Sequence, residues 1–141
     1  MIIEVGKYVL DCDVAATVVA FAAYTPYECG CDGCRNFRVA GPVAFFPILG
    51  LFQKFGIDRA KPAEVFHVGP PDDELILQYE GWFHFIGRMI SDGDIVNVSS
   101  NSKMYFVSRP ALIPPSFEGQ PLVQMEFELR APWLLPEPWK P

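Results

Sequence analysis

Three cysteines and two glycines are concentrated in six consecutive residues, Cys29-Gly30-Cys31-Asp32-Gly33-Cys34. No other segment of the 141-residue chain gathers potential ligands so densely. Neighbouring thiolates repel one another unless a metal ion, a disulfide or a redox reaction engages them. The segment is therefore the part of the sequence from which chemistry can best be argued.

The spacing fits part of a structural zinc site, which needs four ligands. Three of them would come from one glycine-containing loop, namely Cys29, Cys31 and Cys34. We predict Cys12 as the fourth, because a Cys₄ set would use every cysteine of the chain, and His67 and His84 are the alternatives. Only one of the two knuckles usual in such sites is present, so bound zinc is one hypothesis among several.

Thiol–disulfide chemistry is a second interpretation, with Cys31 and Cys34 as a Cys-x-x-Cys pair. A helical turn that begins at this pair would lower the pKa of a thiol. Thioredoxin-like enzymes, however, place the motif in a βαβ unit, whereas the sequence downstream is typical of hairpins. Two further interpretations are a disulfide or sulfenate switch resolved by Cys29, and inert reduced thiols in a sharp turn.

The motif continues beyond the cysteines as Arg35-Asn36-Phe37, then a helical pattern, then Phe55-Gly56-Ile57-Asp58-x-x-Lys61-Pro62-x-Glu64-Val65. This combination resembles a pattern of small uncharacterised bacterial proteins to which no reaction is assigned. The resemblance covers Cys29 to Val65, a minority of the chain. It implies that the cysteines, the Arg-Asn-Phe step and the helix form one structural unit, and it implies no catalytic residue.

Two apolar segments flank the cysteines. The β-branched run Val14 to Tyr24 predicts a strand buried on both faces, with a buried helix as the alternative. After the cysteines, Pro47 suits a first helical turn, and an apolar stripe follows at helical spacing: Ile48, Leu51, Phe52 and Phe55. This pattern predicts an amphipathic helix over 45–56 that Gly56 terminates.

The second half of the chain is dominated by alternating patterns that predict strands, separated by Gly, Pro and Asp turns. The predicted strands are Glu64 to Val68, Leu75 to Ile86, Met104 to Val107 and Leu122 to Arg130. We expect an α+β fold: a mostly antiparallel sheet or partly closed barrel packed by the helix over 45–56. Residues 1–131 would form a single domain, and the Pro- and Trp-rich tail 132–141 would run extended along the domain or a neighbour.

The chain is acidic, with a net charge of −6 and a pI near 4.8. Direct binding to nucleic acid is not expected, because phosphate contacts need a surplus of lysine and arginine. A membrane span is not expected either, since the longest apolar run, 14–24, is too short. The start of the chain lacks the pattern of a secretory signal, so we expect a cytoplasmic protein with reduced cysteines.

No nucleophile elbow, phosphate-binding loop or zinc-protease helix is present in the sequence, so an enzyme is not favoured. Our leading hypothesis is an acidic binding protein, for example of an immunity or inhibitor type, with a basic protein partner. Its binding surface would be the polar face of the strand over 75–86, with Glu80, Trp82 and His84. The edges of a sheet also make a homodimer conceivable.

Overall fold

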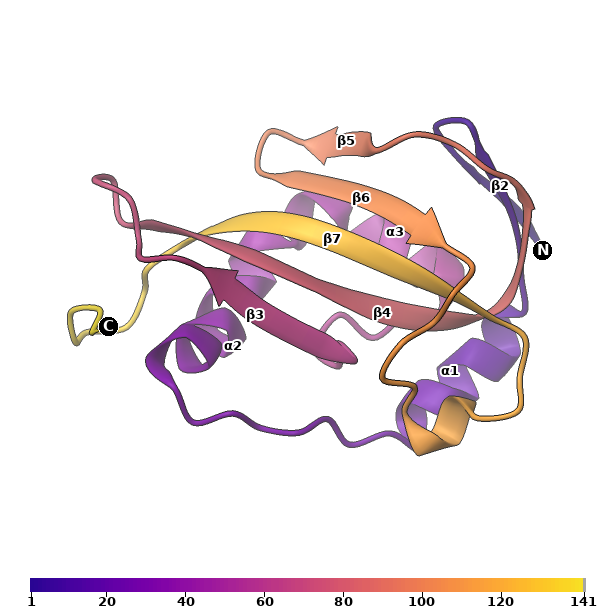
Figure 1. Ribbon diagram of the computed structural model, residues 1–141, viewed down its shortest axis with the longest axis horizontal. Coiled ribbons are helices and arrows are strands. Elements are labelled where there is room, and N and C mark those ends of the chain that lie inside the picture. The colour runs from indigo at the N-terminus through magenta and orange to yellow at the C-terminus, as the bar shows by residue number, and fades with distance from the viewer. Residues whose placement is uncertain (141) are drawn as a thin grey trace.

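One open antiparallel sheet organises residues 1–140, the part of the chain that the computed structural model describes (Figure 1). Its seven strands are β1 (Ile2–Val5), β2 (Tyr8–Cys12), β3 (Glu64–Val68), β4 (Ile76–Ser91), β5 (Val96–Ser99), β6 (Ser102–Val107) and β7 (Leu122–Pro132). The helices are α1 (Val14–Ala22), α2 (Asp32–Ala44) and α3 (Leu49–Phe55), with short 3-10 turns η1 (Phe46–Ile48) and η2 (Pro115–Phe117). The predicted α+β class is confirmed, and the sheet is not closed into a barrel.

The long strand β4 connects the two parts of the sheet. The strand order is β1-β2-β4-β7-β6-β5, and β3 pairs with β4 outside this path. Residues 78–82 of β4 pair with β3, whereas residues 87–91 pair with β2. Strand β7 lies along the opposite edge of β4. Because β4 has 16 residues, it is long enough to take two successive partners on one edge.

Helices α2 and α3 cover one face of the sheet, behind the strands in Figure 1. An aromatic core fills the space between these helices and the sheet, and the fully buried Phe45 lies at its centre. The ring of Phe45 lies 5.2–6.3 Å, centroid to centroid, from four other rings, those of Phe37, Phe52, Phe83 and Phe127. Such edge-to-face contacts stabilise a core beyond the burial of apolar area. We call the opposite side of the sheet the outer face.

The segment predicted as a strand over 14–24 forms helix α1, so that prediction is wrong and its helical alternative is right. The residue before the helix explains why. Asp13 is the N-cap, and its carboxylate accepts a hydrogen bond from the backbone N–H of Ala16 at 3.0 Å. The buried side chains share one helical stripe: Thr17, Ala20 and Phe21. The other positions are partly or fully exposed, as an amphipathic helix requires and a doubly buried strand does not.

The single helix predicted over 45–56 is divided into η1 and α3, and Gly56 ends it in the left-handed conformation as expected (φ 74°). The longest helix is instead α2, with 13 residues. Because Pro42 lies in the last turn of α2, its missing N–H removes one hydrogen bond without interrupting the helix.

The tail follows β7 and lies against the start of α2. The backbone N–H of Trp133 donates to the carbonyl of Leu75 at 2.8 Å, and that of Leu134 donates to Asn36 Oδ1 at 2.7 Å. The tail thus contacts the domain from which it emerges. Pro141, the last residue of the predicted tail, lies outside the described residues.

Candidate metal centre

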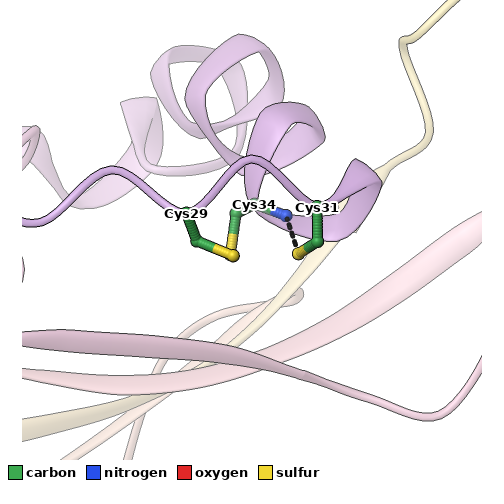
Figure 2. Close-up of side chains that lie close together, drawn as sticks. All are labelled: Cys29, Cys31 and Cys34. Atoms are coloured by element: carbon green, nitrogen blue, oxygen red, sulfur yellow. Dashed lines mark hydrogen bonds between the residues drawn. The ribbon is translucent and has the colours of Figure 1, made fainter.

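The sulfur atoms of Cys29, Cys31 and Cys34 lie within 4.8 Å of one another. Figure 2 shows all three on the same side of the loop and of the first turn of α2. Each sulfur offers one ligand atom, so the three cysteines are close enough to hold a metal ion. All four cysteines of the chain are free thiols.

The start of α2 produces this convergence. Cys31 is the N-cap, with an extended backbone (φ −68°, ψ 158°), and its sulfur accepts a hydrogen bond from the backbone N–H of Cys34 at 3.4 Å. The first helical turn places Cys34 on the same side of α2 as the N-cap residue Cys31, because residues three apart lie on the same side of a helix. Cys29 is held by Arg38, whose guanidinium donates to its carbonyl at 3.0 Å.

The pKa values of two of the thiols, Cys29 and Cys34, are shifted in opposite directions. The backbone N–H of Cys31 lowers the pKa of the Cys29 thiol, and the neighbouring thiols of Cys31 and Cys34 lower it further. Burial, together with the neighbouring thiols of Cys31 and Cys29, raises the pKa of Cys34 to about 12. A thiolate on Cys29 is therefore favoured over one on Cys34 in the metal-free cluster. A bound cation would stabilise further thiolates in the same place.

Two buried polar side chains attach the first turns of α2 to the sheet and the tail. The hydroxyl of Tyr79, on β4, donates to the carbonyl of Gly33 at 2.6 Å. The side-chain amide of Asn36 donates to that hydroxyl and to the carbonyl of Pro132, both at 3.1 Å. These hydrogen bonds position the turn that carries Cys34, although neither residue belongs to the cluster.

A cleft of about 450 Å³ lies beside the cluster. Cys29 and Cys34 line it together with Arg38 from α2. Arg59, in the segment before β3, and Glu64, the first residue of β3, also line the cleft. One side of the candidate centre is thus accessible to small molecules or to solvent.

Cys12 lies apart from the cluster, so the structure does not bring the predicted Cys₄ set together. It ends β2, where its sulfur donates to the carbonyl of Phe55 at 3.5 Å, and it is 1% exposed. Burial raises the pKa of this thiol to about 11. Cys12 is a core residue because β2 pairs with β4 far from the start of α2.

The geometry also bears on the predicted redox pair. Cys31 and Cys34 do stand at the start of a helix, as expected. The lowered pKa, however, belongs to Cys29, and that of Cys34 is raised. The surrounding sheet is antiparallel, not the βαβ frame of thioredoxin-like enzymes. These pKa shifts therefore favour a thiolate on Cys29 over one on Cys34.

Of the three residues of the predicted binding surface, Glu80 and Trp82 are partly exposed, whereas His84 is buried. Glu80 and Trp82 lie on the outer face, both partly exposed, and the indole N–H of Trp82 donates to the carbonyl of Ala111 at 3.0 Å. His84 points to the same side but is 1% exposed, so its assignment to an exposed surface is wrong. The connection between β6 and β7 covers it, with the Phe117 ring centroid 6.1 Å away. This connection crosses in front of the sheet in Figure 1.

Residues that support the cluster were missed by sequence reasoning. Tyr79 and Arg38 have no motif, because their roles depend on contacts between segments distant in the sequence. Asn36 did have a signal: it stands in the Cys-Arg-Asn-Phe step that the sequence pattern joined to the cysteines. Its hydrogen bonds to Tyr79 and to the tail give that step a structural reason.

Comparison of the chain with family models, with curated proteins and with solved structures found no match. None of the helices within residues 1–140 is both long enough and apolar enough to cross a membrane.

Proposed function

We propose that this chain is a metal-binding protein and that its ion is Zn²⁺, held by the thiolates of Cys29, Cys31 and Cys34. The observation that carries the proposal is the mutual approach of the three sulfur atoms to within 4.8 Å. Tetrahedral zinc with Zn–S bonds of about 2.3 Å separates its sulfur ligands by about 3.8 Å. The cluster therefore needs only a small contraction to coordinate the ion.

The role we propose for the ion is structural. Between α1 and α2 the chain from 24 to 31 contains no helix or strand, and it carries Cys29 and Cys31. Zinc would join this segment to the first turn of α2 and so stabilise one wall of the cleft. The positive end of the α2 dipole also favours thiolates at this position.

Metal analysis of the purified protein tests the proposal. We expect one equivalent of zinc in the wild type, retention in Cys12→Ala and loss in Cys34→Ser. Cys12→Ala is the matched control, because it removes a thiol that is buried elsewhere. Wild-type protein that takes up no zinc when reduced and supplied with the ion would refute the proposal, and would leave thiol chemistry centred on Cys29 as the interpretation to pursue.

A second candidate function, the binding of a basic protein partner, is favoured by the charge pattern of the outer face. Glu80 and Glu128 are direct partners across β4 and β7, and Trp82 stands opposite Glu126. Like charges placed opposite each other destabilise a sheet. After burial, the carboxylate of Glu126 is the largest cause of a raised pKa at Tyr105 on the neighbouring strand. A basic partner would relieve this repulsion and contact the aromatic side chains between the carboxylates.

A synthetic polylysine peptide can probe this face by backbone NMR. We expect salt-sensitive shifts on β4 and β7 near Glu80 and Glu128, and their loss in the double variant Glu80→Gln, Glu128→Gln. Asp73→Asn, in the turn before β4, is the control and should leave the shifts unchanged. Shifts spread evenly over every acidic segment would show that the face has no preference for basic ligands.

A further inference from the structure

Three thiolates leave one position of a tetrahedral zinc ion without a protein ligand. Cys12 cannot fill it from the core position in which the fold holds it. The side chain of His67, on β3, lies beside the first turn of α2. The inference that follows rests on the proposed zinc site and concerns its fourth ligand.

The register of the sheet turns His67 toward α2. His67 is the direct cross-strand partner of Tyr79, so the two side chains lie on the same face of the sheet. Tyr79 reaches α2 on that face, since its hydroxyl donates to the carbonyl of Gly33. The neighbouring Phe66, on the outer face, is 43% exposed. His67 therefore faces the helix that carries Cys34.

The His67 ring lies directly against Gly33. A Cβ atom placed on Gly33 would be 3.1 Å from Nε2 of His67 and in closer conflict with Cδ2 of the same ring. Gly33 lies between Asp32 and Cys34 in the first turn of α2. Because Gly33 has no side chain, an imidazole nitrogen of His67 can lie close to it. Gly33 directly precedes Cys34, so this nitrogen lies one residue from a cysteine of the cluster.

The other ring nitrogen of His67, Nδ1, already makes the kind of hydrogen bond that is common in metal-binding histidines. Nδ1 lies 3.2 Å from the carbonyl oxygen of Gly69 and donates its proton to it. In that tautomer Nε2 has a free lone pair and is the ligand atom. A backbone carbonyl that accepts from the other nitrogen is a common partner of metal-bound histidine, because it fixes both the tautomer and the ring orientation.

We infer that His67 is the fourth ligand, so that the centre is a Cys₃His site closed by Nε2. In the described structure the group of mutually close ligand atoms comprises the three sulfurs alone, so Nε2 of His67 and the sulfurs must move closer together when the ion binds. A neutral imidazole leaves the site with a net charge of −1, whereas a fourth thiolate would leave −2. The ion would then join three segments: the chain before α2, the first turn of α2, and β3.

X-ray absorption of the zinc-loaded full-length chain tests the inference. We expect three sulfur ligands at about 2.3 Å and one nitrogen at about 2.0–2.1 Å. In His67→Gln the nitrogen contribution should disappear, and the zinc affinity, measured by competition with a chromophoric chelator, should fall at least about tenfold. Val65→Ala is the matched control. It lies two residues earlier on the same face of β3 and is also partly buried, but it offers no ligand atom.

A measurement on the wild type makes the test independent of how the variant folds. In a ¹⁵N spectrum of the imidazole rings, zinc should shift Nε2 of His67, whereas the ring of His84, buried against Gln124, should not respond. Three sulfurs and one oxygen around the zinc, or an unshifted Nε2, would overturn the inference while leaving the proposed zinc site intact. A wild type that binds no zinc at all would overturn both.

Discussion

Replacement of Tyr79 by Phe tests whether one hydroxyl attaches the cysteine-bearing turn to the sheet. Tyr79 is 1% exposed, and its hydroxyl both donates to Gly33 and accepts from Asn36. Burial raises the pKa of this phenol to about 12, so it is protonated under ordinary conditions. Tyr79→Phe removes the hydroxyl and retains the ring, which contacts Phe37 with centroids 5.2 Å apart.

The expected loss follows from the two partners left behind. A buried polar group that loses its hydrogen bond costs about 1–3 kcal/mol. The Gly33 carbonyl belongs to the first turn of a helix and has an intrahelical partner, so its cost is at the low end of that range. One N–H of the Asn36 amide is left unpaired and buried, at the high end. We therefore expect a loss of about 4 kcal/mol in the free energy of unfolding, the sum of about 1 kcal/mol for the carbonyl and about 3 kcal/mol for the amide.

Urea unfolding of reduced, metal-free protein, followed by circular dichroism, measures this difference. Tyr105→Phe is the matched control, because Tyr105 is a partly exposed residue of the outer face, and its change should stay within about 0.5 kcal/mol. Zinc affinity should also fall in Tyr79→Phe and not in Tyr105→Phe, since only the first change releases the turn before Cys34. Equal stability of the two variants would refute the attachment argument.

Three further predictions concern the core, the sheet and the pH dependence. Phe45→Ala should lower the free energy of unfolding by about 3–5 kcal/mol in urea unfolding, because it opens a cavity among four packed rings. Gly87→Ala should cost about 1–3 kcal/mol and speed amide exchange along β2, because the new Cβ would collide with the backbone carbonyl of Asp11; unchanged exchange would contradict this. Burial lowers the pKa of His84, which is therefore neutral in the fold, whereas the unfolded chain takes up a proton below about 6.5. Stability should thus decrease as the pH falls from 7 to 5, and His84→Phe should show a smaller decrease; equal slopes in urea titrations would exclude this role for His84.

Local patterns were sufficient where one segment determines its own structure. The alternation from Leu122 to Arg130 predicted β7. Gly56 was identified as the end of a helix because glycine readily adopts the left-handed backbone conformation found there. The run over 14–24 was misread because its β-branched residues outweighed the Asp13 cap, which in the folded chain satisfies a backbone N–H at the start of α1.

The sequence by itself determined the α+β class, the acidic charge and the gathering of three thiols in six residues, because each of these depends on composition or on spacing along a short segment. Only the tertiary structure decided which other residues meet those thiols. Strand pairing buries Cys12 against Phe55, places His84 beneath the β6–β7 connection, and brings the ring of His67 onto Gly33. These contacts join segments more than 30 residues apart, and their register is set by the packing of whole strands and helices, which no local spacing encodes.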